Sequence, residues 1–468
     1  MKRIICLSIA VCLVFSMLLI GTSCKGSSGT TTEAAETTAA AETTTTTEGI
    51  PVPEGKVSID FWLQDWSGGL KWFGDFVNIF QKKYPNITVS VMAIPFKDLN
   101  TKIVTSIAQG TEPALMFVYT DWLMNYDISK MFFPLSPAIY SASEFREKFY
   151  TQPLDIINRS SSSKEIYGMP LVTGGNGLGF IIHKDLFDEA GIDPSTIDTW
   201  DKLLEAAKKL TVYNGDGTIK RMGIHINTFE AANMVLDLTL QQGAQSKLYN
   251  HDTGVFNFNI PEFANAVNIL KRFEDEKTFD PKGGDSFTAF PNKLTAMAAH
   301  GPWSYGYFST DYPELNLDFI LVPTYPGAKR LHGTLPWSTV VASKKLEGDE
   351  KNAALLFINE IMKNPDFYNI PFDGLYWTGI ISNKSYVESV VAAVEKGNAT
   401  VSQKICAIAS SNVVPNLMSM GQRIGDTSLA NDYILPELQK VFTGEETIEE
   451  AQANLSKNVT SVEQAMME

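Results

Sequence analysis

The sequence contains few cysteines and histidines and no excess of positive charge. Its 468 residues include 4 Cys and 5 His, and 38 Lys and Arg stand against 53 Asp and Glu, for a net charge of −15. The cysteines, at positions 6, 12, 24 and 406, supply neither a disulfide framework nor a cysteine zinc site. The charge balance argues against nucleic acid and against docking to anionic lipid, because both need clustered Lys and Arg.

Sequence motifs of common enzymes are also missing. The histidines, at positions 183, 225, 251, 300 and 332, form no HExxH motif, and the chain has no GxSxG or Walker loop. Residues 214–218 resemble part of a calcium loop but lack its final glutamate, so a hairpin turn is the simpler interpretation. We therefore predict a protein that is not an enzyme and has no metal or cofactor. A surface glycosidase with two carboxylates across a cleft is the enzymatic alternative.

The N-terminus has the features of a bacterial export signal. Lys2 and Arg3 precede an apolar run at residues 4–20, and small residues then lead to Cys24. A cysteine at this place resembles the lipobox, in which the thiol is acylated, although Gly21 replaces the usual leucine. We predict a lipoprotein signal peptide at residues 1–23 and a lipid anchor at Cys24; an ordinary cleaved signal or an uncleaved anchor is the alternative.

The next segment is too polar to fold. Residues 25–53 consist mainly of Thr, Ala, Glu, Ser and Gly, which cannot bury enough apolar surface to offset their conformational entropy. We interpret residues 24–55 as the lipidated cysteine and a disordered tether. The protein is then extracytoplasmic and anchored to a bacterial membrane, at the cell surface or in the periplasm.

From residue 56 onward, strand and helix patterns alternate. Alternating or continuous apolar residues predict strands at 56–63, 87–94 and 114–119, with amphipathic helices at 70–84 and 97–109 between them. This order predicts a parallel sheet with right-handed crossovers. Further strands are predicted at 179–182, 224–226 and 319–322, and further helices at 200–210, 261–276, 349–364 and from 432 onward.

Several short segments follow one another in a recognisable order. They are Phe61-Trp62, YPNITV at 84–89, EPAL at 112–115, YGMP at 167–170, FIIHKDLF at 180–187, TWDKL at 199–203, KLTAM at 293–297, GPW at 301–303, FTG at 442–444 and TIEEA at 447–451. In this order they resemble the extracellular solute-binding proteins of ABC sugar importers, the family that includes the maltose-binding proteins. The resemblance covers essentially all of residues 56–468.

The resemblance implies an α/β fold of the two-lobed periplasmic-binding-protein type (type II). Mixed, mostly parallel sheets flanked by helices are expected, with a ligand cleft between the lobes. By analogy, an N-terminal lobe would comprise residues 56–172 and 331–374, and a C-terminal lobe residues 173–330 and 375–468.

A sugar site needs aromatic platforms for the C–H face and polar groups for the hydroxyls. Trp303 matches the family position that stacks on the sugar, and Asp121 matches a hydroxyl-binding Asp; a core Trp beside a turn and a helix-capping Asp are the alternatives. Strand ends at one sheet edge favour Gln64, Asp65, Trp66 and Trp122. Trp337, Tyr376 and Trp377 flank the presumed crossings between the lobes, and plain hinge packing is the alternative for them. The predicted ligand residues are Gln64, Asp65, Trp66, Asp121, Trp122, Asn176, Trp303, Trp337, Tyr376 and Trp377. Trp72 and Trp200 lie in amphipathic helices and are expected in the core, whereas Trp62 could face either side of its strand.

One departure from the family narrows the expected ligand. Pro415-Asn416 is followed by residues 417–423 without the aromatic that maltose-binding proteins have there. Gln422 or Arg423 could supply a polar contact instead. A smaller or differently shaped sugar is therefore favoured over a long maltodextrin stacked on several aromatics.

The leading hypothesis is a monomeric substrate-binding lipoprotein of an ABC transporter. It would capture a carbohydrate between its lobes and deliver it to the transmembrane permease subunits. The alternatives are the same fold binding a non-sugar solute such as a peptide, polyol or metal complex, a ligand sensor, and the glycosidase named above.

Overall fold

The computed structural model describes most of the chain beyond the predicted tether. The described residues are 49–65, 67–123, 126–149, 154–155, 164–174, 179–301, 303–329, 332–333, 335–363, 380–381, 383–397, 413–414 and 422–467. The predicted signal peptide, Cys24, Trp66, Asn176, Tyr376 and Trp377 lie outside these residues.

The larger sheet has six strands in the order β14-β4-β13-β3-β1-β2. Their bounds are β1 Val57–Gln64, β2 Ile87–Ile94, β3 Leu115–Tyr119, β4 Gly168–Gly174, β13 Leu335–Ala342 and β14 Ile380–Ile381. Helices α1 (Ser67–Lys83) and α2 (Phe96–Gln109) connect β1, β2 and β3, which run parallel as predicted. The remaining pairs of this sheet, β13 with β3 and with β4, and β14 with β4, are antiparallel.

The prediction of mostly parallel sheets is therefore wrong for the described strands. A crossover helix fixes the direction of the next strand only where the connection is short, as it is between β1 and β3. Strand β13 enters the sheet more than 150 residues after β4, so no local pattern determines its direction.

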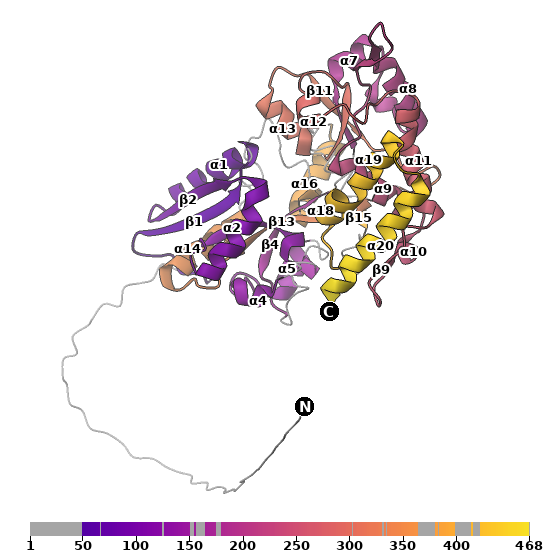
Figure 1. Ribbon diagram of the computed structural model, residues 1–468. Helices are drawn as coiled ribbons and strands as arrows, with labels where there is room; N and C mark the ends of the chain where they lie inside the picture. The colour runs from indigo at the N-terminus through magenta and orange to yellow at the C-terminus, as the bar shows by residue number, and fades with distance from the viewer. Residues whose placement is uncertain are drawn as a thin grey trace, which may run out of the picture. The chain divides into compact units, whose positions relative to one another are not determined.

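Aromatic side chains form the core around the larger sheet. The Phe61 ring of β1 lies 5.0 Å from Phe73 of α1 and 5.8 Å from Phe357 of α14 (Gly348–Lys363), both edge to face. Phe357 also contacts Phe76 and Phe80. These rings follow helical spacing on α1, which is why the amphipathic pattern located the helix correctly. In Figure 1, α1, α2 and α14 flank β1 and β2.

A second apolar core surrounds a three-stranded sheet of order β10-β5-β11. Strand β5 (Gly179–His183) pairs antiparallel with β10 (Met297–His300) and with β11 (Leu317–Leu321). The predicted strand at 224–226 is wrong, because this segment forms only isolated bridges, such as the parallel bridge from His225 to Ala298. Its backbone still bonds to β10, since the His225 N–H donates to the Met297 carbonyl and the Ala299 N–H donates to the His225 carbonyl, both at 2.8 Å.

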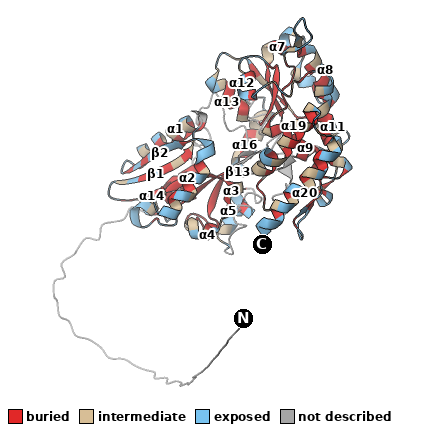
Figure 2. Cartoon of the chain, viewed as in Figure 1, coloured by how far each residue is buried: buried red, intermediate tan, exposed pale blue. Residues whose placement is uncertain are grey.

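Helices cover this second core. They are α7 Lys184–Glu189, α8 Trp200–Leu210, α9 Phe229–Gln241, α11 Pro261–Asp275, α19 Leu435–Thr443 and α20 Ile448–Met467. The Thr199 side chain caps α8. Trp200 of α8 is buried here and Trp72 of α1 is buried in the first core, as predicted for both. The inner faces of α9, α11 and α19 are buried in Figure 2, and the yellow α19 and α20 lie beside α9 and α11 in Figure 1.

A buried glutamate ties the C-terminal helix to the preceding segment. The Glu463 carboxylate accepts hydrogen bonds from the backbone N–H groups of Arg423 (2.6 Å) and Ile424 (2.8 Å). It also accepts one from the Tyr249 hydroxyl at 2.7 Å. Charge-assisted bonds of this kind are strong when buried, so α20 holds residues 423–424 in place.

Short elements complete the described chain. They are α3 Thr120–Leu123, α4 Ile128–Met131, α5 Ala142–Lys148, η1 Pro194–Thr196, β6 Val212–Tyr213, β7 Ile219–Arg221, α10 Gln245–Leu248, β8 Tyr249–Asn250, β9 Val255–Phe256, α12 Ser286–Ala289, α13 Trp303–Asp311, β12 His332–Gly333, α16 Lys384–Glu395, β15 Val413–Val414, α18 Asp426–Ser428 and the π-helical η3 Leu429–Ile434. Strands β6 and β7 form the hairpin predicted around residues 214–218. None of the helices in the described ranges is long and apolar enough to cross a bilayer.

Candidate ligand-binding site

Asp121 stands at the carboxyl end of β3, in the first turn of α3. Its carboxylate accepts hydrogen bonds from the Thr427 hydroxyl and from backbone N–H groups, including those of Trp122 and Thr427. Burial raises the pKa of Asp121 above its ordinary value, and these hydrogen bonds oppose part of that rise. A Cβ atom on Gly425 would lie only 3.0 Å from Asp121 Oδ2, so Gly425 permits this close approach.

Gln64 and Trp122 lie in one polar and aromatic cluster with Tyr119 and Phe96, near the carboxyl end of β3. Gln64 Oε1 accepts a hydrogen bond from the Tyr119 hydroxyl. The Trp122 ring lies 4.9 Å from Tyr119 and 5.9 Å from Phe96, and Phe96 is 42% exposed. Sequence reasoning missed Tyr119 and Phe96, although both stand at strand ends of the edge that had singled out Trp122.

Asp65 and Trp62 lie near the same edge but make different contacts. Asp65 is exposed, and its backbone N–H donates to the Ile94 carbonyl. The Lys102 ammonium lies 4.9 Å from the centre of the Trp62 ring, a cation–π contact with α2. Trp62, whose direction the sequence left open, thus faces α2.

Trp303 begins α13, three residues after the last residue of β10. It belongs to an aromatic group, hereafter the Trp303 group, which contains Phe287, His300 and Tyr307. The Trp303 ring is nearly parallel to that of Phe287, at 5.8 Å and 20°, and lies 5.5 Å from His300 and 6.4 Å from Tyr307. A Cβ atom on Gly301 would lie 2.5 Å from Trp303 Nε1, so only glycine fits there.

Polar groups lie beneath these rings. His300 Nδ1 is 3.5 Å from Glu230 Oε2, and both side chains are almost fully buried. Within the described residues, neither ring nitrogen of His300 has a hydrogen-bond partner, and neither does Trp303 Nε1. Sequence reasoning missed Phe287, His300 and Glu230; only the position of His300 at the end of an apolar strand, just before GPW, could have signalled it.

The other predicted residues are placed less fully. Trp337 lies in β13 where its register with β4 shifts, and its side chain is outside the described set. Gln422 is buried and donates its amide N–H to the Ile424 carbonyl at 3.0 Å. Arg423 is half-buried. Their predicted contacts with a ligand remain predictions.

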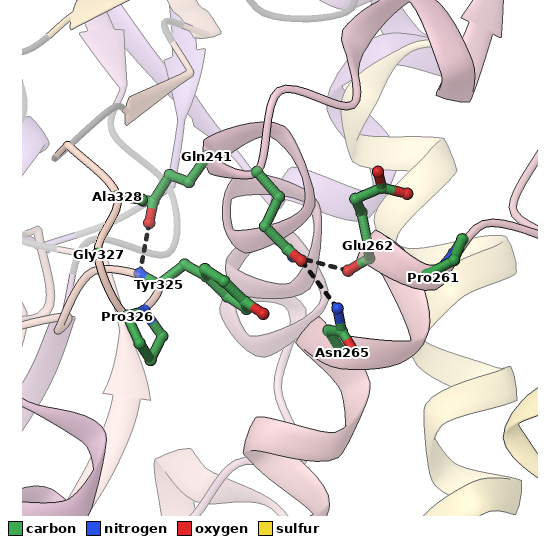
Figure 3. A pocket seen from close by; sticks show the side chains of 9 residues that line it. Gln241, Pro261, Glu262, Asn265, Tyr325, Pro326, Gly327 and Ala328 are labelled. Atoms are coloured by element: carbon green, nitrogen blue, oxygen red, sulfur yellow. Dashed lines mark hydrogen bonds between the residues drawn. The ribbon is translucent and has the colours of Figure 1, made fainter.

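A separate pocket of about 380 Å³ lies beside α9 and α11. Figure 3 shows its lining, in which Gln242 donates to the Glu262 carbonyl at 2.8 Å and accepts from Asn265 at 3.1 Å. Tyr325 N–H donates to Gln241 Oε1 at 2.7 Å. Of the predicted ligand residues whose side chains the structure describes, none lines this pocket. The described part of the chain also contains no cluster of three or more His, Cys, Asp or Glu suited to a metal ion.

Solved structures share this fold. An ABC substrate-binding protein of Listeria monocytogenes, in complex with cycloalternan, matches with a TM-score of 0.66 and 24% identity, covering 87% of this chain and 99% of the other. The maltose/maltodextrin-binding domain MalE of Bdellovibrio bacteriovorus, bound to maltotriose, matches with a TM-score of 0.65 and 18% identity, covering 87% and 99%. At these identities the likeness establishes the two-lobed fold.

Sequence relatives are distant. The arabinooligosaccharide-binding protein of Bacillus subtilis is 23% identical over 343 residues, 69% of this chain and 74% of the relative. A binding protein of Brucella abortus is 23% identical over 269 residues, 56% of this chain, and the match spans only 62% of the length of that relative. Residues 65–364, well over half of the chain, match the family described as bacterial extracellular solute-binding protein. The chain is a member of the bacterial extracellular solute-binding protein family.

Proposed function

We propose that this protein is the substrate-binding lipoprotein of an ABC importer and that its ligand is a mono- or oligosaccharide. The observation that carries the proposal is the arrangement of the Trp303 group, in which an aromatic platform stands beside buried polar atoms at the end of β10. Aromatic faces bind the C–H surface of a sugar, and polar groups beside them bind its hydroxyls. The ligands named for the related proteins, cycloalternan, maltotriose and arabinooligosaccharide, support the same class.

In the proposed mechanism the ligand is held between two lobes, at 56–172 with 331–374 and at 173–330 with 375–468. The two separate apolar cores support this division. Trp303 stacks on the sugar, and a sugar hydroxyl replaces the Thr427 hydroxyl as a partner of Asp121. The ligand favours the closed form because only that form completes both sets of contacts, and the permease subunits recognise the closed form.

Thermal unfolding tests the proposed ligand class. The protein is heated with monosaccharides, maltose, maltotriose, β-1,6-galactobiose, arabino-oligosaccharides, polyols, amino acids and peptides. A ligand at 100 times its dissociation constant stabilises the folded state by about 2.7 kcal/mol, which raises the midpoint clearly. A rise with one sugar class that is lost in Trp303→Ala supports the proposal. Tyr213→Ala is the matched control, because Tyr213 is an exposed aromatic of the β6–β7 hairpin.

Other outcomes favour the alternatives. A rise in the unfolding midpoint only with peptides, polyols or amino acids is consistent with the fold but contradicts a sugar as the ligand. Release of hydrolysed sugar during incubation supports a glycosidase instead. Retention of wild-type protein in the membrane fraction, with loss of Cys24→Ala to the soluble fraction, tests the lipid anchor.

A further inference from the structure

His300 is a buried histidine whose ring nitrogens form no hydrogen bond within the described residues. Its side chain is 1% exposed, and neither Nδ1 nor Nε2 has a hydrogen-bond partner in the part of the chain that the structure describes. A buried polar group without a partner destabilises a folded protein, and such groups are rare unless water or a ligand completes them. The other two buried histidines among the described residues, His183 and His225, each pair Nε2 with a backbone carbonyl, so His300 differs from them in having neither nitrogen paired.

Glu230 is placed to orient this imidazole. Its carboxylate lies 3.5 Å from His300 Nδ1 and is itself almost fully buried. The Thr228 hydroxyl, which caps α9 by accepting from the Ala231 N–H at 3.1 Å, donates to the Ala299 carbonyl at 2.9 Å. That bond fixes the first turn of α9, and hence Glu230, against the end of β10. A carboxylate next to Nδ1 favours the tautomer with its proton on Nδ1, which leaves Nε2 as an acceptor.

The wall beside His300 is aromatic and partly open. The Phe287 ring lies 5.0 Å from the imidazole and is nearly parallel to that of Trp303, and Phe287 is 39% exposed. It stands on α12, a helix of only four residues. A ligand that rests on Trp303 and moves Phe287 aside would bring its hydroxyls to the imidazole.

We infer that His300, oriented by Glu230, accepts a hydrogen bond from a hydroxyl group of the ligand stacked on Trp303. This inference rests on the proposed function, since it requires a hydroxyl-bearing ligand. His300 contacts the ligand, whereas Glu230 is a positioning residue that acts through His300. A buried water could present the same O–H group to Nε2, so the experiment separates the two sources.

The experiment combines His300→Phe with sugars that lack single hydroxyls. Calorimetric titration first selects the tightest-binding sugar among glucose, galactose, arabinose, maltose, maltotriose, β-1,6-galactobiose and arabinotriose, and its monodeoxy analogues are then compared. In the wild type, one deoxy analogue binds roughly 10- to 100-fold more weakly than the parent sugar, because the missing hydroxyl leaves His300 Nε2 unpaired. His300→Phe keeps an aromatic ring but has no hydrogen-bond acceptor. The variant therefore binds the parent sugar more weakly and no longer distinguishes the parent sugar from that analogue.

Two further variants complete the design. Glu230→Gln is expected to bind the parent sugar more weakly and to discriminate less against the same analogue, with discrimination against the other analogues unchanged. A general structural defect would not produce this selective change. His183→Phe is the control, because His183 is a buried histidine of β5 bonded to the Phe290 carbonyl and lies outside the Trp303 group. Its affinity for the parent sugar should be unchanged.

Each outcome decides the inference. His300→Phe that loses affinity but still discriminates the analogue, or that keeps full affinity, overturns it while the proposed function stands. Unchanged affinity together with a lower thermal midpoint of the ligand-free variant identifies a buried water as the partner and also overturns it. If no sugar of the panel binds, the proposed function fails and this inference fails with it.

Discussion

The buried His225 predicts a loss of stability in mild acid. Burial lowers the pKa of His225 from 6.5 to about 4, and its Nε2 lies 3.0 Å from the Gly284 carbonyl oxygen. As the pH falls below 6.5, the unfolded chain takes up a proton at this residue while the folded protein does not. The free energy of unfolding therefore falls as the pH drops, until the folded pKa near 4 is reached. At about 1.4 kcal/mol per pKa unit, the loss between about pH 7 and about pH 4 is about 3 kcal/mol.

Urea unfolding of the wild type and of His225→Gln, followed by tryptophan fluorescence at several pH values, measures this loss. The variant is expected to be less stable at neutral pH but to lose about 3 kcal/mol less on acidification. Burial also lowers the pKa of His183, so His183→Gln shows how much of the remaining pH dependence a second histidine explains. Equal slopes for the wild type and His225→Gln would refute the reasoning.

Three further predictions concern single contacts. Burial raises the pKa of Asp121, so protonation of its carboxyl stabilises the folded protein at low pH, and this stability is lost as the pH rises through the raised pKa. Asp121→Asn should abolish this loss, which urea midpoints measured across that pH range would show. An unchanged pH profile would contradict the prediction. Gly301→Ala places a Cβ 2.5 Å from Trp303 Nε1, so it should cost about 1–3 kcal/mol of stability and weaken sugar binding in titrations; retained affinity would show that Trp303 need not keep this position. Glu463→Gln cannot accept from all three donors, so a loss of about 2–4 kcal/mol is expected in urea unfolding, and a loss under about 1 kcal/mol would contradict the assigned hydrogen bonds.

Local patterns predicted the elements of the first βαβαβ unit well. Strands β1 to β3 and helices α1 and α2 agree with the sequence to within a few residues, because their periodicity reflects one core. The segment at 224–226 has the same apolar character, yet it forms isolated bridges rather than a strand. Whether an apolar run pairs fully depends on neighbours that are distant in sequence, such as β10. Periodicity carries no information about them.

The same limit applies to the candidate site. Family resemblance and strand ends singled out Trp303 and Asp121, but not their partners. Thr427 is about 300 residues from Asp121 in the chain, and Glu230 is 70 residues from His300. Neither partner belongs to a motif, so only the folded chain brings them together. The sequence did not indicate Phe287 either, because a single aromatic on a four-residue helix has no periodic signal.

Some of the buried polar atoms that lack a partner within the described residues lie where the ligand is proposed to bind. His300 and Trp303 have buried nitrogens that no described group pairs with, and burial raises the pKa of Asp121. Natural sequences are consistent across levels except where function requires otherwise, so such defects concentrate at functional sites. A ligand can shift a conformational equilibrium only by its difference in affinity for the two states. Hydroxyl groups that complete the His300 and Trp303 nitrogens would supply part of that difference, since no described group of the chain forms a hydrogen bond with them. The unsatisfied atoms are therefore expected to make closure depend on the ligand, and an apolar replacement at His300 should lessen that dependence.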